Sequence, residues 1–187
     1  AAPSGPEVKH RSTILFSGSA QGAAIAAAEE LRTRFNVAVD LWSATSYKTL
    51  REDALAVERH NRLHPSHPPK VARVTALLSG CSDPVIAVSD FMKIVPEQIA
   101  RFVPGRSFTA LGTDGMGRSD TRDALRSHFE IDMPNIVVAV LAALAQSGAM
   151  SPDIVQQAIA KYDIKPSRQD KYKQVEEFLR ILSPALD

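Results

Sequence analysis

The stretch that decides the fold is STILFSGSAQGAAIAAAEELRTRFNVAVDLW, residues Ser12–Trp42. The short apolar run Ser12–Ser17 ends at a glycine and predicts a buried strand. Ser19 can then cap a helix that reaches Phe35, and Val37–Trp42 predicts a second strand. The inward stripe expected for the helix is Ile25, Ala28 and Leu31. A strand, a helix and another strand in succession form the repeating unit of a parallel sheet.

The same alternation continues along the chain. A polar segment with helical spacing runs from Leu50 to Leu63 and stops at His64-Pro65. The next expected elements are a short helix over Val71–Leu78, a strand over Val85–Val88, a helix over Phe91–Val103 and a strand over Ser107–Leu111. Three helices should follow, at about Asp120–Phe129, Pro134–Ser147 and Pro152–Tyr162. This order predicts an α/β fold in three layers, α/β/α, with a mainly parallel sheet and extra C-terminal helices.

Composition indicates one globular domain. The 187 residues are 44% hydrophobic and 23% charged. We interpret residues 1–11 as a linker, because Pro, Ser and Gly dominate before the first apolar run, and residues 12–187 as the domain. A chain that opens on a linker can be the downstream part of something longer. The tail Ser167–Leu182 should be an amphipathic helix packed on a neighbour, through Tyr172, Val175, Leu179 and Leu182.

Charge and hydropathy exclude several classes of protein. The net charge of +1 argues against a nucleic-acid surface. The longest apolar run, Ile136–Ala145, is shorter than a membrane span, and the N-terminus does not resemble a signal peptide. The single cysteine, Cys81, excludes an internal disulfide and suits a reducing compartment. We therefore expect a cytoplasmic protein without nucleic-acid or membrane partners.

One glycine-rich loop has the layout of a phosphate cradle, LGTDGMGRSDTRDALRSHFEI at Leu111–Ile131. Its glycine order is G-x-x-G-x-G, the reverse of the dinucleotide fingerprint, and it follows a late strand rather than the first. The simpler interpretation is a tight turn in which Ser119 caps the next helix, with Asp120 and Asp123 in the first helical turn.

The first turn, SGSAQG, is the better-placed candidate for binding an anion. It follows the first strand at a helix N-terminus, where backbone N–H groups face outward. The candidate residues are Ser17, Gly18, Ser19 and Gly22. Against an anion site, no acidic residue closes the second strand, and an ordinary helix cap explains the same residues.

The sequence gives little support for a metal site or a catalytic site. His60, His64 and His67 form a histidine cluster, for which capping or interface roles are favoured over a metal site. The sequence has no H-E-x-x-H, C-x-x-C or G-x-S-x-G motif, and Cys81 is expected to be inert. The residues by themselves indicate an α/β domain with no self-contained active site.

Several segments, in order, resemble the homodimeric type of pyruvate dehydrogenase, the thiamine diphosphate-dependent first component of the pyruvate dehydrogenase complex. They are FNVAVDLWSATSYKTL, VERHNRLHP, PVIAVSDFMK, EQIARFVP, GTDGMGRSDTRDALRSHFEID, NIVVAVLAALAQSGAM and IVQQAIAKYDI. The likeness extends from about Ser12 to Ile164 and implies a transketolase C-terminal domain, preceded in the family by two thiamine-binding domains. Those domains hold the diphosphate, Mg²⁺ and the aminopyrimidine, so the resemblance assigns no catalytic, cofactor-binding or metal-binding residue to this chain.

The resemblance does imply an interface role for the motif loop, residues 112–119. Its candidate residues are Gly112, Asp114, Gly115, Gly117, Arg118 and Ser119. The glycines permit turns, and the two charged side chains can fix the loop or reach a neighbouring domain. Met116 stands where the family usually has an aromatic residue.

The function implied is a structural and assembly domain of an enzyme that decarboxylates pyruvate and passes the acetyl group to a lipoyl carrier. The implied partners are the thiamine-binding domains of the same enzyme, a homodimer partner and the lipoyl acetyltransferase component. The chain alone is expected to be inactive. Three alternatives stay open: the C-terminal part of another transketolase-family enzyme, a freestanding anion- or nucleotide-binding module, and a metal-dependent interaction domain built on the histidines.

Overall fold

The computed structural model describes residues 8–81, 84–103 and 105–164. Its centre is a four-stranded sheet with the order β2-β1-β3-β4. The strands are β1 (His10–Phe16), β2 (Val37–Ser43), β3 (Val85–Val88) and β4 (Phe108–Leu111), and all three pairings are parallel. The expected strands are confirmed, although β1 begins two residues before the apolar run that predicted it.

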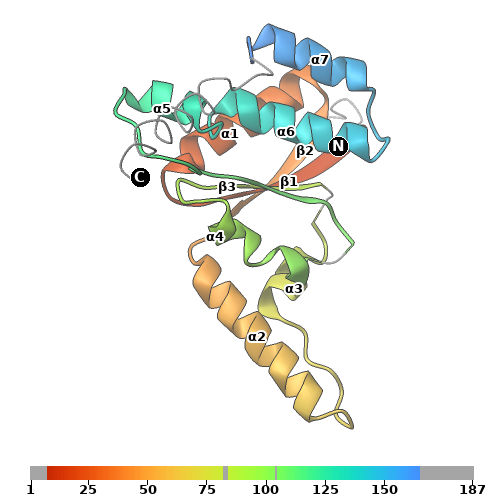
Figure 1. Cartoon of the computed structure of the whole chain (residues 1–187). Coiled ribbons are helices and arrows are strands. Elements are labelled where there is room, and N and C mark those ends of the chain that lie inside the picture. Colours follow the sequence, from red (N-terminus) through yellow and green to blue (C-terminus); the bar gives the residue numbers. More distant parts are fainter. Residues whose placement is uncertain (1–7, 82–83, 104, 165–187) are drawn as a thin grey trace, which may run out of the picture.

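Helices cover both faces of the sheet (Figure 1). On one face lie α1 (Gln21–Arg34), α5 (Arg122–His128), α6 (Met133–Gln146) and α7 (Pro152–Lys161). On the other lie α2 (Tyr47–Leu63), α3 (Arg73–Leu78) and α4 (Ile94–Glu97). Two short 3-10 helices complete the described elements, η1 (Gly18–Ala20) and η2 (Ala100–Phe102). The three-layer α/β/α prediction is confirmed.

The two faces carry separate hydrophobic cores, because successive strand residues point to opposite sides. Ile14 and Ile86 pack with α1 and α6, whereas Leu15 and Val85 pack with α2 and α3. All four β3 residues are buried. A strand covered on both faces reads as a continuous apolar run, which is why VIAV was recognisable.

The most apolar segment belongs to the first of these cores. Of the described residues, Arg122–Gln146 is long and apolar enough to cross a membrane by length and composition, with a hydropathy of 1.4. This span consists of two helices, α5 and α6, and one side of α6 is packed inside the protein. Its fully buried residues are Ile136, Val137, Val140 and Leu141. A core helix of a globular domain explains the span.

Two details of the first helix differ from the prediction. The residue preceding α1 is Ala20, and Ser19 makes no side-chain cap. Ile25 is 50% exposed, and the buried stripe is Ala24, Ala27 and Leu31. Residues 22–28 are all glycine or alanine except Ile25. The 3.6-residue period of hydrophobic side chains therefore does not determine which face of the helix is inward.

The helix expected over Phe91–Val103 is wrong. The structure has only the single turn of α4 and the 3-10 turn η2 there. Pro96 lies in the first turn of α4, where no N–H donor is required. Each later helix begins as sequence chemistry favours: Asp132 caps α6, Ser151 caps α7, and a proline lies in the first turn of both.

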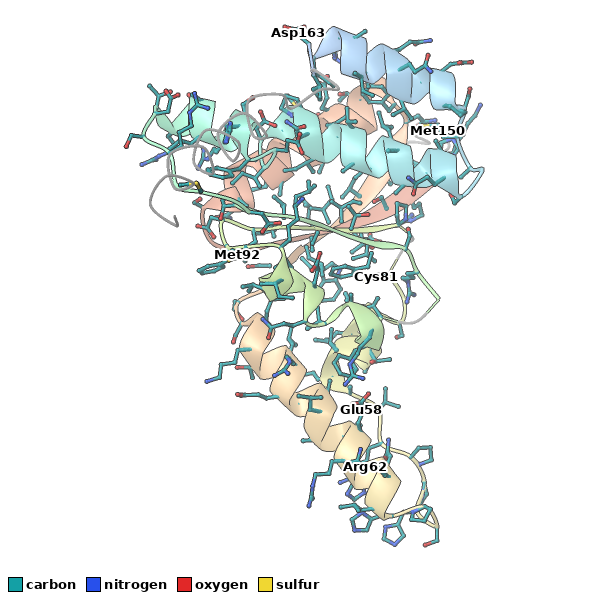
Figure 2. The ribbon with its side chains drawn as sticks, viewed as in Figure 1. Glu58, Arg62, Cys81, Met92, Met150 and Asp163 are labelled. Atoms are coloured by element: carbon teal, nitrogen blue, oxygen red, sulfur yellow. The ribbon has the colours of Figure 1, made fainter. Side chains whose placement is uncertain are left out.

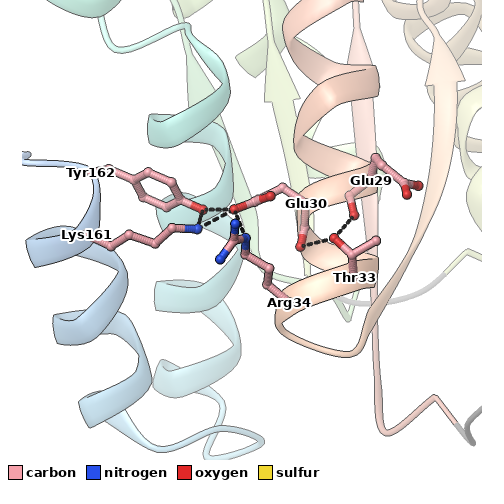
Figure 3. Close-up of polar contacts among 6 residues, drawn as sticks. All are labelled: Glu29, Glu30, Thr33, Arg34, Lys161 and Tyr162. Carbon is pink, nitrogen blue, oxygen red and sulfur yellow. Dashed lines mark hydrogen bonds and ion pairs between the residues drawn. The ribbon is translucent and has the colours of Figure 1, made fainter.

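A cluster of polar contacts ties α7 to α1 (Figure 3). The Tyr162 hydroxyl donates a 2.7 Å hydrogen bond to Glu30 Oε1, and Lys161 Nζ and Arg34 Nε reach the same oxygen. These contacts fix the end of α7 to α1. The predicted tail helix, Ser167–Leu182, lies outside the described residues.

Candidate functional site

The motif loop, residues 112–119, starts at the carboxyl end of β4 and lies against the segment that follows β3. Asp114 Oδ1 accepts a 2.9 Å hydrogen bond from the Lys93 backbone N–H. The Thr113 N–H donates to Phe91 O at 2.9 Å, and its hydroxyl donates to Asp90 O at 3.0 Å. The beginning of the loop is thus fixed by hydrogen bonds to residues about twenty positions earlier.

The three glycines of the loop serve different purposes. A Cβ on Gly112 would lie 2.5 Å from Phe91 O and 2.7 Å from Lys93 N, so the close approach of the two segments requires glycine. Gly115 has a φ of 105°, a conformation that L side chains rarely adopt. Gly117 has open space where a Cβ would stand and no positive φ. Spacing alone could not separate these roles.

The second half of the loop is exposed. Residues 115–124 are all exposed, including Arg118 and Ser119. Arg118 Nε lies 3.9 Å from Asp120 Oδ2, a loose surface ion pair. The predicted Ser119 cap is wrong: Thr121 caps α5 by accepting from the Ala124 N–H at 3.4 Å. Asp123 does lie in the first turn, as expected, whereas Asp120 precedes the cap and lies outside that turn. Arg118 is therefore presented outward and does not hold the loop together across the sheet edge.

The first turn, predicted as an anion site, faces a carboxylate of the protein itself. The Ser19 N–H donates to Asp90 Oδ2 at 3.2 Å, and a Cβ on Gly18 would lie 2.6 Å from Asp90 Oδ1. Ser17 is buried and its hydroxyl donates to Ser89 Oγ at 2.9 Å. Gly22, by contrast, has no atom within 4 Å of where a Cβ would stand. An external anion would therefore compete with Asp90 for the same N–H group.

This turn lies at the point where open parallel sheets usually bind ligands. β1 and β3 are neighbours in the sheet. The connection after β1 leads to β2 on one side, and the connection after β3 leads to β4 on the other. In this protein, Ser17 and Ser89 lie at that point and share a hydrogen bond, and Asp90 accepts from the Ser19 N–H there. Sequence reasoning missed Asp90, although its signal was present: an acidic residue stands two positions after a buried strand.

Exposed apolar side chains gather beside the motif loop. They come from the segments after β3 and β4 and are 56–59% exposed: Phe91, Met92, Ile94 and Met116. Figure 2 labels Met92 at this edge of the sheet. The hydrogen bonds of Asp114 and Thr113 fix the two segments to each other, and the four exposed side chains that they carry are named here the edge patch. A group of this kind is typical of an interface.

A shallow hollow lies behind the loop. Its volume is ≈ 350 Å³, and its lining includes Ser19, Thr113, Arg122, Arg126 and Phe129. Arg126 Nη2 donates to Ser19 O at 3.2 Å, so part of its charge is already engaged by the backbone. No group of three or more His, Cys, Asp or Glu side chains in the described ranges is arranged to hold a metal ion.

The three histidines lie together at the end of α2, far from this edge. The rings of His60 and His64 stack at 4.3 Å, and those of His64 and His67 at 5.4 Å. His64 Nδ1 lies 2.9 Å from His60 O, at the C-terminal cap of the helix. Desolvation, followed by the nearby charges of Lys70, His64 and His67, lowers the pKa of His60. A capping role fits this geometry.

Comparisons with known proteins agree with this architecture. A family model described as "Transketolase-like TK C-terminal domain" matches residues 4–132. The pyruvate dehydrogenase E1 component of Pseudomonas aeruginosa is 46% identical over 164 residues, which cover 88% of this chain and 19% of that protein. The E1 components of Mycolicibacterium smegmatis and Escherichia coli are 44% and 40% identical over 85% and 83% of the chain.

The chain thus spans about a fifth of the length of the curated relatives it matches. A solved structure titled "Split gene transketolase, inactive beta4 tetramer" aligns with a TM-score of 0.49 and 19% identity, over 74% of this chain and 40% of that one. The family model matches well over half of the chain, across the whole parallel sheet and the motif loop. The chain therefore belongs to the family of transketolase-like TK C-terminal domains.

Proposed function

We propose that this chain is the C-terminal domain of a thiamine diphosphate-dependent pyruvate dehydrogenase and serves its assembly rather than its chemistry. The observation that carries the proposal is the 46% identity to a pyruvate dehydrogenase E1 component over 88% of the chain. In such an enzyme the cofactor supplies the decarboxylation of pyruvate, and the acetyl group passes to a lipoyl carrier. We also propose that the protein is cytoplasmic.

The described residues at the expected binding position do not fit the cofactor. At the carboxyl ends of β1 and β3, the Ser19 N–H already donates to Asp90, whose carboxylate would repel a diphosphate. The described residues also contain no cluster suited to Mg²⁺. The thiamine-binding domains of the same polypeptide would hold both groups, and this domain would support them from outside.

The edge patch supports the assembly role. Four large apolar side chains, each more than half exposed, stand on two segments fixed to each other by hydrogen bonds. Loops fixed in this way lose little conformational freedom on binding, which favours association. We assign the patch to the contact with the thiamine-binding domains of the enzyme or of its homodimer partner.

The direct test compares the isolated chain with the full polypeptide. Release of CO₂ from labelled pyruvate, with thiamine diphosphate, Mg²⁺ and an artificial electron acceptor, should be absent for the chain and present for the full polypeptide. Transfer of the acetyl group to a lipoyl domain of the acetyltransferase component is the second readout. Decarboxylation by the pure 187-residue chain would contradict the proposal.

A C-terminal domain of another transketolase-family enzyme is the nearest alternative. The family model is compatible with it, whereas the named relatives are pyruvate dehydrogenase E1 components. The same full polypeptide discriminates the two: ketol transfer between sugar phosphates, without turnover of pyruvate, would favour the alternative.

A freestanding anion- or nucleotide-binding module is the second alternative, with Ser17, Gly18, Ser19 and Gly22 as its site. Titration calorimetry of the isolated chain with phosphate, adenine nucleotides and thiamine diphosphate tests it. Because Asp90 already accepts from the Ser19 N–H, we expect no micromolar binding. Binding that strengthens in Asp90→Asn would favour the module.

A further inference from the structure

The second half of α2 projects from the domain as an arm. Figure 1 shows α2 leading away from the sheet and the following loop returning beside it. Near the middle of the helix, the ion pair between Glu58 and Arg101 of η2, at 2.7 Å, joins α2 to the body of the domain. Beyond Glu58, the residues 59–71 are named here the α2 arm. Figure 2 shows Arg62 near its far end.

Hydrogen bonds within the arm hold its loop against the helix. The Asn61 side chain donates to Lys70 O at 2.9 Å and accepts from the Lys70 N–H at 2.8 Å. These two bonds fix the returning segment of the loop to the helix. The His64 N–H donates to His60 O and the His67 N–H to His64 O. Pro65, Pro68 and Pro69 restrict the loop further. Among the described residues, these hydrogen bonds stay inside the arm.

Its surface is basic and partly apolar. Residues 59–71 contain Arg59, Arg62 and Lys70, three histidines and no carboxylate. Every residue from 62 to 71 is exposed, and Leu63 and Val71 are 53% and 64% exposed. Two apolar side chains among three permanent cations fit a protein interface with an acidic rim. The arm does not suit a nucleic-acid partner, because its three cations, in a chain with net charge +1, would release few counterions from the phosphates.

We propose that the α2 arm docks onto an acidic surface of the remaining polypeptide of the enzyme. This inference rests on the function proposed above, because the acidic partner belongs to the four fifths of the relatives' length that lies outside this chain. Charge complementarity steers the arm to the surface, and Leu63 and Val71 supply the apolar contact. Docking of the arm and burial of the edge patch attach the domain at two separate places.

Hydrogen exchange of the full polypeptide tests the arm. The amides of residues 61–64, 66 and 67 should exchange about tenfold or more slowly in the full polypeptide than in the isolated chain. The variant Arg59→Glu/Arg62→Glu/Lys70→Glu should abolish that protection. Its control, Lys9→Glu/Arg32→Glu/Lys48→Glu, changes the net charge equally at exposed sites off the arm and should retain the protection. Equal exchange in the full polypeptide and the isolated chain would overturn the proposal.

Carbodiimide cross-linking identifies the occupant. Lys70 Nζ should form an amide with an Asp or Glu of the polypeptide outside residues 1–187. A cross-link to a second copy of these residues, or protection that requires added nucleic acid, would overturn the proposal. The failure of the two proposals can be distinguished. A full polypeptide that decarboxylates pyruvate with an unprotected arm refutes only the docking, whereas a protected arm without decarboxylation refutes the assigned enzyme.

Discussion

Asp114 Oδ1 accepts a hydrogen bond from the Lys93 backbone N–H at 2.9 Å, and this contact joins the loop after β4 to the loop after β3. Lys93 Nζ also lies 3.9 Å from Asp114 Oδ2, but both side chains are 38% exposed, so this ion pair adds little. Asp114 thereby holds in place the surface on which Met92 and Met116 stand. Asp114 thus fixes the beginning of the loop, and the interface role expected from the resemblance stays a prediction.

Replacing Asp114 separates the hydrogen bond from the charge. Asp114→Ala removes the acceptor of the Lys93 N–H and should lower the free energy of unfolding by about 1 kcal/mol. Asp114→Asn keeps an acceptor oxygen and should lose clearly less. Urea denaturation of both variants measures the difference. Equal losses would show that the charge, and not the bond to the backbone, matters.

The loop glycines provide a matched pair of substitutions. Gly112→Ala places a Cβ 2.5 Å from Phe91 O, so the backbone of one segment must move, and we expect a loss of at least about 2 kcal/mol of stability. Gly117→Ala meets nothing within 4 Å and should be neutral or slightly stabilising. In the full polypeptide, the contact between this domain and the thiamine-binding domains should weaken only in Gly112→Ala. Similar melting temperatures for the two variants would refute the distinction.

The Tyr47 hydroxyl is a buried polar group in the hydrophobic core between the sheet and α2. Its side chain is 4% exposed, its oxygen has no hydrogen-bond partner among the described residues, and burial raises the pKa of the hydroxyl. Tyr47→Phe removes an unsatisfied polar group and should raise the free energy of unfolding by up to about 1 kcal/mol. Tyr162→Phe is the control: its hydroxyl donates to Glu30, so the same change should destabilise. Destabilisation by Tyr47→Phe would reveal a partner for the hydroxyl.

Strand β3 was predictable because burial on both faces leaves an unbroken apolar run, VIAV at Val85–Val88. The capping of the first helix was not predictable from Ser19. Its backbone N–H is satisfied by Asp90, seventy-one positions later, and a contact of that range leaves no local pattern. The glycine motif identified the loop, but only the approach of Phe91 and Lys93 shows why Gly112 differs from Gly117.

Glu30 connects two helices that sequence reasoning treated separately, and its ionisation makes this connection dependent on pH. The hydrogen bond from Lys161, then that from Tyr162, lowers the pKa of Glu30 below its ordinary value of 4.5. The folded state therefore favours the carboxylate. Its contribution to stability is fully present above about pH 4.5 and is lost as the pH falls through the lowered pKa.

Glu30→Gln should therefore cost about 1 kcal/mol at pH 7, and the difference from the wild type should shrink steadily below pH 4.5. Glu29→Gln is the matched control, because it removes the same charge one residue earlier, where the partner is only the exposed Arg32 in the same helix. We expect a smaller loss for it. Urea denaturation at pH 3.5, 5 and 7, together with hydrogen exchange of α7, measures both effects. A Glu30→Gln deficit that stayed constant with pH would show that α7 is held by packing on α6 and not by this carboxylate.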